Sequence, residues 1–456
     1  MAGGTFNRLV GKDRPGTYIN FESTRTETVG LSERGIVLLP LINHDYGPAG
    51  EFITINSSSP DAQIVKLGYS IFDLHPNMLL IREALKRARR VIAYIPRQGA
   101  RATNTTTGAG NATITARARF GGTRGNDLRY SVVERPTGGY DVTVFRDSTV
   151  VGLHEGLNAV EELTAQNDAW IEFSGTGNLF AVAGVRLQGG TTGELVVSDI
   201  TAFLDKSEHE RWNVLAFPLE ATGEPNDPVP GLHGAVAMKI RYLREDTGRP
   251  RKAVLPNFRA NYEGIINVTN SVVLNGGHAL TLAQVTAWVA GADSGASNIQ
   301  SNTYVPYVGA IDVVEPKSHD AAVKAIRQGE FFFSKSEEGE VIVEFDINSL
   351  TDFRFPKDST WRKNRVLRVM DTFAESLMLN FPPNRFANAP VGWDIMEGLG
   401  RAILALFYDV GAIKNVDYDN DFLVDREASS GDEVYFNVGL QAVDSAEKLF
   451  FTIRTR

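Results

Sequence analysis

The chain has 456 residues, of which 43% are hydrophobic and 22% are charged, a composition typical of folded globular protein. Its net charge of −9 argues against a dedicated nucleic-acid binder, because such proteins carry a basic balance or a basic stripe. Cysteine is absent, which excludes disulfide scaffolds, thiolate zinc sites and cysteine nucleophiles and suits synthesis in a reducing cytosol.

The first residues contain no apolar segment of the kind that a secretory signal requires. The longest apolar runs, at 35–42 and 402–413, are too short to span a bilayer, so we expect no membrane insertion. Within the polar start of the chain, residues 17–21 (TYINF) alternate as a strand does, directly after the break signal Pro15-Gly16. Nothing nearby resembles a hairpin mate, so this strand is predicted to lack a local partner.

Residues 35–98 alternate between strand and helix patterns. Strands are predicted at 35–42, 51–57 and 91–96, with an amphipathic helix at 76–90 between the last two. The same alternation resumes near residue 200 and predicts a packed α/β sheet. Its predicted strands are 212–218, 252–258 and 263–274, its helices are 234–248 and 280–292, and a hairpin follows at 329–347.

Between these two parts the composition changes abruptly at residues 99–112, which are rich in glycine and threonine and show no periodicity. Short alternating segments separated by glycine-rich turns follow, and no lysine occurs from 99 to 200. This spacing predicts a compact all-β module inserted into a loop of the α/β core, because loop tips tolerate whole inserted domains. The alternating segments are 114–120, 128–135, 140–146, 170–175 and 179–187.

The last third carries two predicted helices, 361–381 and roughly 391–410, and the chain ends in KLFFTIRTR. In this ending Leu449, Phe451 and Ile453 share one face, which is a strand pattern that needs a neighbour. One interpretation is a local hairpin with residues 433–443, although the connection lacks the glycine or asparagine of a tight turn. The other is pairing with a different molecule.

The start of the 361–381 helix is strongly basic, with Arg362, Lys363, Arg365 and Arg368. One interpretation is a solvated face on which Arg368 pairs with Asp371 at i,i+3. The other is a contact with an acidic partner surface.

No residue constellation supports catalysis, cofactor binding or metal binding. The seven histidines show no HxH or HExxH spacing, there is no GxSxG elbow, and GGTRGND at 121–127 lacks the GK[ST] of a phosphate loop. Asp417, Asp419 and Asp421 have EF-hand spacing, but Phe422 and Ala428 stand where that loop needs glycine and glutamate. We therefore predict no catalytic, cofactor-binding or metal residues, no cofactor and no enzyme activity.

Six motifs occur in order along the chain: PGTYINF, ERGIVLLPL with DYGP, WVAGADSGASNIQSNTYVPYVGA, FDINSLTDF, KNRVLRVMD and AVDSAEKLFFTIRTR. Together they resemble those of contractile phage tail sheath proteins of the Gram-positive type. The likeness covers nearly the whole chain, including GGTRGND and LQGG in the β insertion. Two places depart from the family pattern, PPNRFANAP at 382–390 and Asp293-Ser294 before Gly295.

The resemblance implies a structural, non-enzymatic subunit of the virion tail, assembled in the host bacterial cytoplasm. Such subunits polymerise with themselves as hexameric rings in a helical stack around a tail tube protein, and contract to drive the tube through a cell envelope. Baseplate and tail terminator proteins are further expected partners, with no direct nucleic-acid contact. The basic residues Arg362, Lys363 and Arg365 become candidates for facing the tube.

The resemblance also implies that terminal arms add strands to sheets of neighbouring subunits. The expected linking residues are Tyr18, Ile19, Phe21, Leu449, Phe451 and Ile453. The predicted fold is therefore a multidomain α/β and α+β protein with a sheath core, an inserted all-β domain and extended terminal strands. The expected parts are an N-terminal arm (1–25), core segments (26–98, 201–345 and 346–446), the inserted outer domain (99–200) and a C-terminal arm (447–456).

Two other functions remain possible from the residues alone. The main alternative is a glycan-binding or adhesion protein with the β insertion as its binding module, and a further one is a hydrolase with unrecognised carboxylates. The sequence does not distinguish a complete phage from a headless, tail-like bacteriocin, because both use the same sheath.

Overall fold

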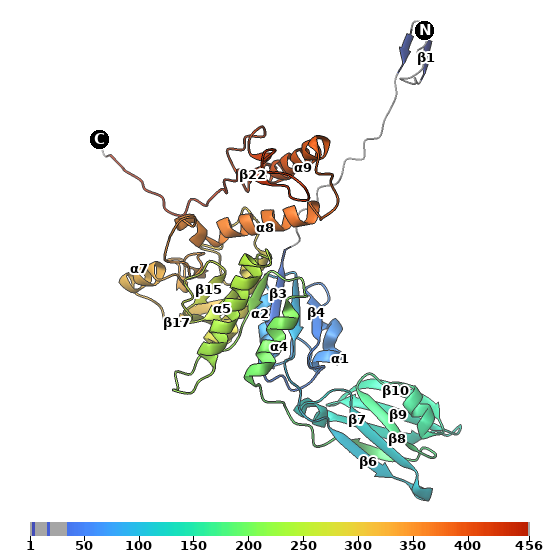
Figure 1. The fold of residues 1–456 in the computed structure, drawn as a ribbon. Helices are drawn as coiled ribbons and strands as arrows, with labels where there is room; N and C mark the ends of the chain where they lie inside the picture. Colours follow the sequence, from blue (N-terminus) through green and yellow to red (C-terminus); the bar gives the residue numbers. More distant parts are fainter. Residues whose placement is uncertain (1, 5–15, 19–33, 455–456) are drawn as a thin grey trace.

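A seven-stranded sheet forms the centre of the computed structural model, which describes residues 2–4, 16–18 and 34–454 (Figure 1). Neighbouring strands run parallel except β4, which is antiparallel to β5. All five residues of β3 and of β14 are buried, as expected for parallel strands covered on both faces. In sheet order the strands are β18 (Glu330–Phe331), β15 (Ile265–Val268), β14 (Lys252–Pro256), β13 (Val214–Ala216), β3 (Ile36–Pro40), β5 (Arg90–Tyr94) and β4 (Phe52–Asn56).

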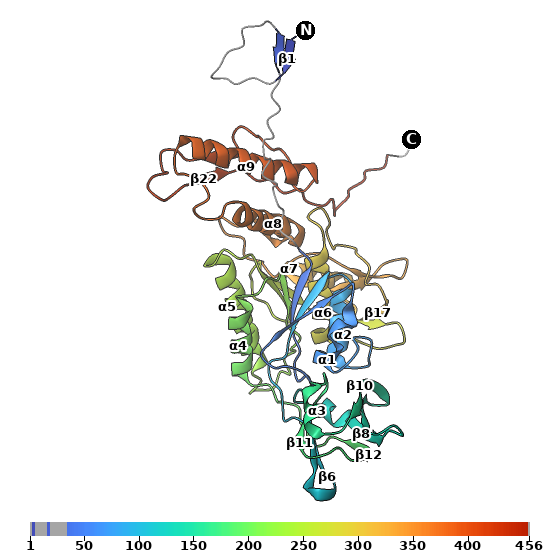
Figure 2. The same cartoon turned by 90° about the vertical axis from the view of Figure 1, so that its right-hand side faces the viewer.

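Helices cover both faces of this sheet (Figure 2). Because side chains alternate along a strand, Val37 and Leu39 of β3 pack in the core with α2 (Pro76–Leu85) and α6 (Leu282–Gly295). Ile36 and Leu38 pack in the opposite core with α4 (Val197–Ser207) and α5 (Val229–Glu245). The prediction of a mixed α/β fold is confirmed. The short helices α1 (Ile64–Leu67) and α7 (His319–Arg327) complete this part.

Two small antiparallel pairs share the core of α6. Trp288 of α6 stacks on Tyr307 with ring centroids 4.3 Å apart, and Phe333 contacts both rings edge-on. The hairpin predicted at 329–347 is present as β19 and β20, whereas the two residues of β18 join the central sheet. The pairs are β16 (Ser271–Leu274) with β17 (Ala310–Val314), and β19 (Phe333–Lys335) with β20 (Val341–Val343).

Between β5 and α4 the chain folds into two antiparallel sheets around a separate hydrophobic core. Residues 99–112, which show no periodicity in the sequence, nevertheless contain the strand β6, whose threonines are mostly exposed and carry no apolar alternation. Threonine favours strands through its branched Cβ, which an apolar pattern does not reveal. The elements are β6 (Thr103–Thr107), β7 (Thr113–Ala118), β8 (Leu128–Glu134), β9 (Tyr140–Arg146), β10 (Thr149–Leu157), α3 (Val160–Ala165), β11 (Ile171–Thr176) and β12 (Val182–Arg186).

Near the N-terminus, β1 (Ala2–Gly4) pairs in parallel with β2 (Gly16–Tyr18). The expectation that the strand at 17–21 lacks a local partner is therefore wrong for its first part. An Ala-Gly-Gly segment has no side-chain alternation, so its backbone pairing leaves no trace in the sequence pattern. Ile19 and Phe21 lie outside the described residues.

The C-terminal part adds a layer at the end of the molecule opposite the β module (Figure 1). It consists of α8 (Asn364–Asn380), α9 (Pro390–Asp409), β21 (Phe422–Val424) and β22 (Phe436–Val438), which share one hydrophobic cluster. β22 pairs with β21, and residues 448–454 form no strand, so the local hairpin between 433–443 and the described end of the chain is not formed.

A buried ion cluster joins this layer to the central sheet. Arg368 of α8 is fully buried, and its Nη2 lies 2.9 Å from Oδ1 of Asp293 at the end of α6. Lys252 of β14 contacts the other carboxylate oxygen of Asp293 at 3.1 Å. The predicted Arg368–Asp371 pair on a solvated face is wrong, because Asp371 pairs with Arg244 of α5 at 2.8 Å. Helical spacing within α8 does not reveal these partners, because Arg244, Lys252 and Asp293 come from α5, β14 and α6, which are remote in the sequence.

Burial opposes ionisation of Asp293, but the charges of Lys252, Arg368 and Arg34 outweigh it and hold the pKa of Asp293 well below its usual range. Burial lowers the pKa of Lys252 and raises that of Asp346, the second carboxylate beside Arg368. Each charge in the cluster thus depends on its partners, because a buried ion without a counter-ion is strongly unfavourable.

We predict that Arg368→Met lowers the free energy of unfolding by about 3–5 kcal/mol, because it leaves Asp293 buried with too little positive charge. Urea denaturation of the full chain measures this change. The matched control is Arg354→Met, whose side chain is 83% exposed and pairs with Asp352 at the surface. That control is expected to change stability by no more than about 1 kcal/mol. Equal effects of the two substitutions would contradict the role of the cluster.

Candidate assembly site

The end of the chain runs away from the body of the molecule on the side of α8 and α9 (Figures 1 and 2). Residues 448–454, the described part of this ending, form no strand within the chain. Their large apolar side chains are exposed to 67% at Leu449, 90% at Phe450, 82% at Phe451 and 86% at Ile453. Burying one such side chain is worth about 1.5–3 kcal/mol, so this segment gains from a partner surface.

The chain is held firmly just before this exposed segment. Val443 donates its backbone N–H to the carbonyl of Ala412 at 2.9 Å. Glu447 then accepts hydrogen bonds from Ser301 Oγ at 2.9 Å and Thr303 Oγ1 at 2.7 Å through one carboxylate oxygen, and pairs with Lys363 through the other. Glu447 is therefore the last residue of the described ending that makes such contacts with the body, and the exposed residues begin at Lys448.

The three residues predicted to face a tube gather around this anchor. Lys363 pairs with Glu447, and Arg365 donates from Nη1 to Ser445 Oγ at 2.6 Å. Arg362 is half-buried next to them, and burial lowers the pKa of both Arg362 and Arg365. Their contact with a tube stays a prediction. These intramolecular contacts could not be predicted from the sequence, because the acceptors lie some 80 residues further along the chain.

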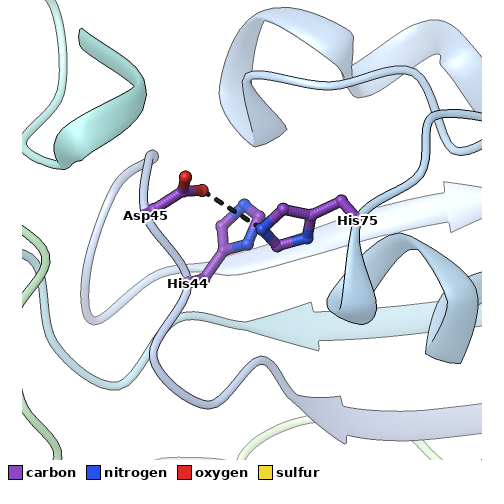
Figure 3. A group of neighbouring side chains, drawn as sticks. All are labelled: His44, Asp45 and His75. Atoms are coloured by element: carbon purple, nitrogen blue, oxygen red, sulfur yellow. Dashed lines mark ion pairs between the residues drawn. The ribbon is translucent and has the colours of Figure 1, made fainter. Parts of the chain in front are cut away.

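A second polar group lies where the core meets the β module (Figure 3). His44 and Asp45 follow β3, and His75 precedes α2, so two loops bring together three side chains that are potential metal ligands. His75 Nε2 lies 3.3 Å from Asp45 Oδ1. No spacing motif announced this group, because its members come from separate loops.

In the observed side-chain conformations, the hydrogen bonds of this group oppose metal binding. His75 Nδ1 accepts the backbone N–H of Asn77 at 3.2 Å as the N-cap of α2, so Nε2 carries the proton that faces Asp45. His44 Nε2 donates to the carbonyl of Leu67 at 2.9 Å, and its Nδ1 faces the amide of Asn77 at 3.3 Å. A metal ligand needs a free nitrogen lone pair, and these contacts occupy both rings. The expectation of no metal site stays a prediction.

Burial and hydrogen bonds together set the charge states of His44 and Asp45. Burial lowers the pKa of His44 to about 4, so this imidazole is neutral at neutral pH. Burial opposes ionisation of Asp45, but hydrogen bonds from His75 and from the Tyr69 hydroxyl, at 2.6 Å, outweigh it and lower the pKa of Asp45 to about 2. Asp45 is therefore a fixed acceptor that joins the loop after β3 to the start of α2.

The same loop attaches the β module. Tyr46 is 1% exposed and lies in the hydrophobic core of the module, against Phe120 and Trp170 with centroid distances of 5.6 and 6.0 Å. The carbonyl of Asp45 accepts the backbone N–H of Arg124 at 3.1 Å. The module is thus docked on the core by a buried aromatic side chain and a hydrogen-bonded loop.

We predict that His44 makes the free energy of unfolding depend on pH. Its folded-state pKa of about 4 lies below the ordinary 6.5, so its effect is absent above about pH 6.5 and stability is lost as the pH falls toward 4. Between about pH 7.5 and about pH 5 the loss is about 2 kcal/mol, and His44→Gln removes that part. Urea denaturation at both pH values measures it. The exposed His278→Gln serves as control, and an unchanged pH dependence in His44→Gln would contradict the prediction.

Comparison with known proteins identifies the family. Residues 193–349 match the model of the phage tail sheath protein central domain, and residues 356–456 match the phage tail sheath C-terminal domain. The chain is 35% identical to the phage-like element PBSX protein XkdK of Bacillus subtilis, over 99% of both chains.

Comparison with solved structures supports the same family. The fold is similar to the crystal structure of a sheath tail protein from Desulfitobacterium hafniense, with a TM-score of 0.81 and 34% identity over 97% of this chain and 100% of that one. The fold alone is also shared with the helical sheath of the anti-feeding prophage in its contracted state, at a TM-score of 0.54 and 12% identity over 98% and 100%.

In the described part of the chain, no helix combines the length and apolar character needed to cross a membrane. The matches extend over nearly the full length and include both family domains. They favour the structural interpretation over the adhesin and the hydrolase. The chain belongs to the family of phage tail sheath proteins, which are structural components of the virion tail.

Proposed function

We propose that this chain is the subunit of a contractile tail sheath, polymerising as helical stacks of hexameric rings around a tail tube and shortening to drive the tube through a target envelope. The observation that carries this proposal is the exposed apolar ending at 448–454, which has no partner strand in the described part of its own chain. The fold shared with a contracted helical sheath supports the same conclusion.

Neighbouring subunits are linked by strand addition through the arms at both ends. A docked C-terminal arm gains roughly four or five ladder hydrogen bonds of about 0.5–1.5 kcal/mol each. It also buries Leu449, Phe451 and Ile453 at about 1.5–3 kcal/mol each. Ordering the segment costs about 1–2 kcal/mol per residue, so the balance per arm is modest. A stable array therefore needs many arms that act together.

The other partners follow from the same assembly. A sheath of this kind surrounds a tail tube protein and ends on baseplate and terminator proteins. The candidate tube-facing site is the basic group Arg362, Lys363 and Arg365. Several weak ion pairs together can hold the sheath on the tube, and each can break separately when the sheath contracts.

We predict that deleting 448–456 gives a soluble monomer that no longer polymerises. Phe451→Asp combined with Ile453→Asp has the same effect, because both side chains then resist burial. Sedimentation measures the assembly, and thermal melting is expected to stay unchanged because these side chains are exposed in the monomer. The matched control is Thr452→Asp, which places the same charge on the other face of the strand. Polymers formed by the deleted chain, or a melting temperature lowered by several degrees, would contradict the proposal.

The β module is proposed to lie on the outside of the assembly and to take little part in contraction. It sits at the far end of the molecule from the exposed ending (Figure 1), and its entry and exit are adjacent, since Ala100 accepts the N–H of Thr191 at 3.2 Å.

We predict that replacing residues 101–190 by a short Gly/Ser bridge leaves a folded core that still polymerises. This deletion bares Tyr46, so Tyr46→Ser is combined with it to keep the new surface polar. Electron microscopy of the product shows the outcome. Loss of polymers in a chain that still melts cooperatively would show that the module contributes to assembly.

A further inference from the structure

Glu447 is the last residue of the C-terminal segment that the body of the protein holds. Its carboxylate is mostly buried and has three partners from two separate segments, the hydroxyls of Ser301 and Thr303 and the ammonium of Lys363. Ion pairs and hydrogen bonds to a charged group are stronger than neutral ones, so this contact is among the firmest that the ending makes. From Lys448 to Arg454 the side chains are exposed.

The surface that receives Glu447 is rigid because it is built on the buried ion cluster. Thr303 accepts the backbone N–H of Asp346 at 3.0 Å, and Asp346 in turn accepts the N–H of Asn302 at 2.9 Å. Asp346 lies 3.6 Å from Arg368, which also holds the carbonyl of Gln300 at 2.8 Å. The loop that carries Ser301 and Thr303 is therefore fixed on both sides.

A second contact fixes the segment just before Glu447. Arg365, the second residue of α8, donates to Ser445 at 2.6 Å, and Lys363 also lies 3.8 Å from Asp444. The basic start of α8, unfavourable for the helix dipole by itself, thus has an acidic partner in this same chain.

This arrangement has a consequence for docking. If the chain were free from residue 444 onward, binding of the apolar strand would also have to order the residues before it. Holding the chain as far as Glu447 removes that cost in advance and fixes the direction in which Leu449, Phe451 and Ile453 are presented. A pre-organised arm binds the same site more tightly without any new contact.

We propose that Glu447, seated on Ser301, Thr303 and Lys363, is a positioning residue that sets where the C-terminal arm leaves the body and so strengthens its docking on a neighbouring subunit. This inference rests on the proposed linking role of the arm. It gives Lys363 a role in holding the arm that does not require a tube, so that reversing the charge of Lys363 weakens sheath assembly even without a tube.

The experiment measures the critical concentration for polymerisation of the full chain alone, by sedimentation, together with its melting temperature. Glu447→Ala is expected to raise the critical concentration about tenfold, which corresponds to about 1.4 kcal/mol per subunit. Glu447→Gln keeps the hydroxyl contacts but loses the charge. Its critical concentration is expected to lie between those of the parent chain and of Glu447→Ala. Glu427→Gln, an exposed glutamate of the same C-terminal part, is the matched control and should behave like the parent chain.

A charge exchange separates positioning from general destabilisation. Lys363→Glu alone should raise the critical concentration, and combining it with Glu447→Lys should restore most of the loss while the melting temperature stays constant. Unchanged critical concentrations in Glu447→Ala, or no restoration by the exchange, would overturn the inference. A Lys363→Glu effect seen only when tube protein is added would assign this residue to the tube instead.

The deletion of 448–456 distinguishes this failure from that of the proposed function. If the deleted chain polymerises normally, the linking role of the arm is wrong. If the deletion abolishes polymers while Glu447→Ala leaves the critical concentration unchanged, the arm links subunits and only the positioning role is wrong.

Discussion

The buried contact between Asp293 and Arg368 is the interaction on which the arrangement of the molecule depends. Asp293 ends a helix packed on the central sheet, Lys252 comes from the middle of that sheet, and Arg368 comes from the C-terminal layer. Buried ion pairs add little net stability compared with apolar packing, but a broken pair is costly. Moving α8 from this placement would leave buried charges without their partners, so the cluster disfavours other placements of α8 on the sheet.

From that fixed point the structure extends in two directions. Toward the C-terminal end, Arg368 holds the loop around Gln300, which in turn carries the seat of Glu447. At the opposite end of the sheet, the loop after β3 places Tyr46 in the β module. The body thus carries a docked module at one end and an exposed apolar ending at the other. The proposed linkage of neighbouring subunits through terminal arms is compatible with this division.

Much of the fold could be predicted from the sequence because it rests on local periodicity. The buried runs of β3 and β14, the amphipathic spacing of α2 and the shift to short alternating segments in the module are all visible in a single chain. The threonine-rich β6 and the Ala-Gly-Gly strand β1 carry no such pattern and could not be found that way. Alternation at the chain end also singles out Leu449, Phe451 and Ile453, which are exposed in the structure and whose linking role stays a prediction.

What the sequence could not show are contacts between distant charges. Asp293 was visible only as a departure from a family motif, and the counter-ion that helical spacing suggested for Arg368, Asp371, pairs with Arg244 instead. In the structure the counter-ions of the basic residues before and within α8 come from Asp293, Asp346 and Glu447, which are remote in the chain. Pairing over such separations is decided by the topology of the sheet and not by spacing along a helix.

The charges that flank residues 449–453 explain why an exposed apolar ending is tolerated. Four large side chains at the surface of a monomer are a liability for aggregation, and edge strands normally carry protection. Here Lys448 and Arg454 flank the apolar residues and add charge at both ends of the segment. Such charges slow unspecific association, whereas pairing in register on a matching sheet edge leaves them at its margins. In the proposed assembly, an ending protected in this way favours a partner that provides both a free sheet edge and an apolar surface, and so favours ordered over random association.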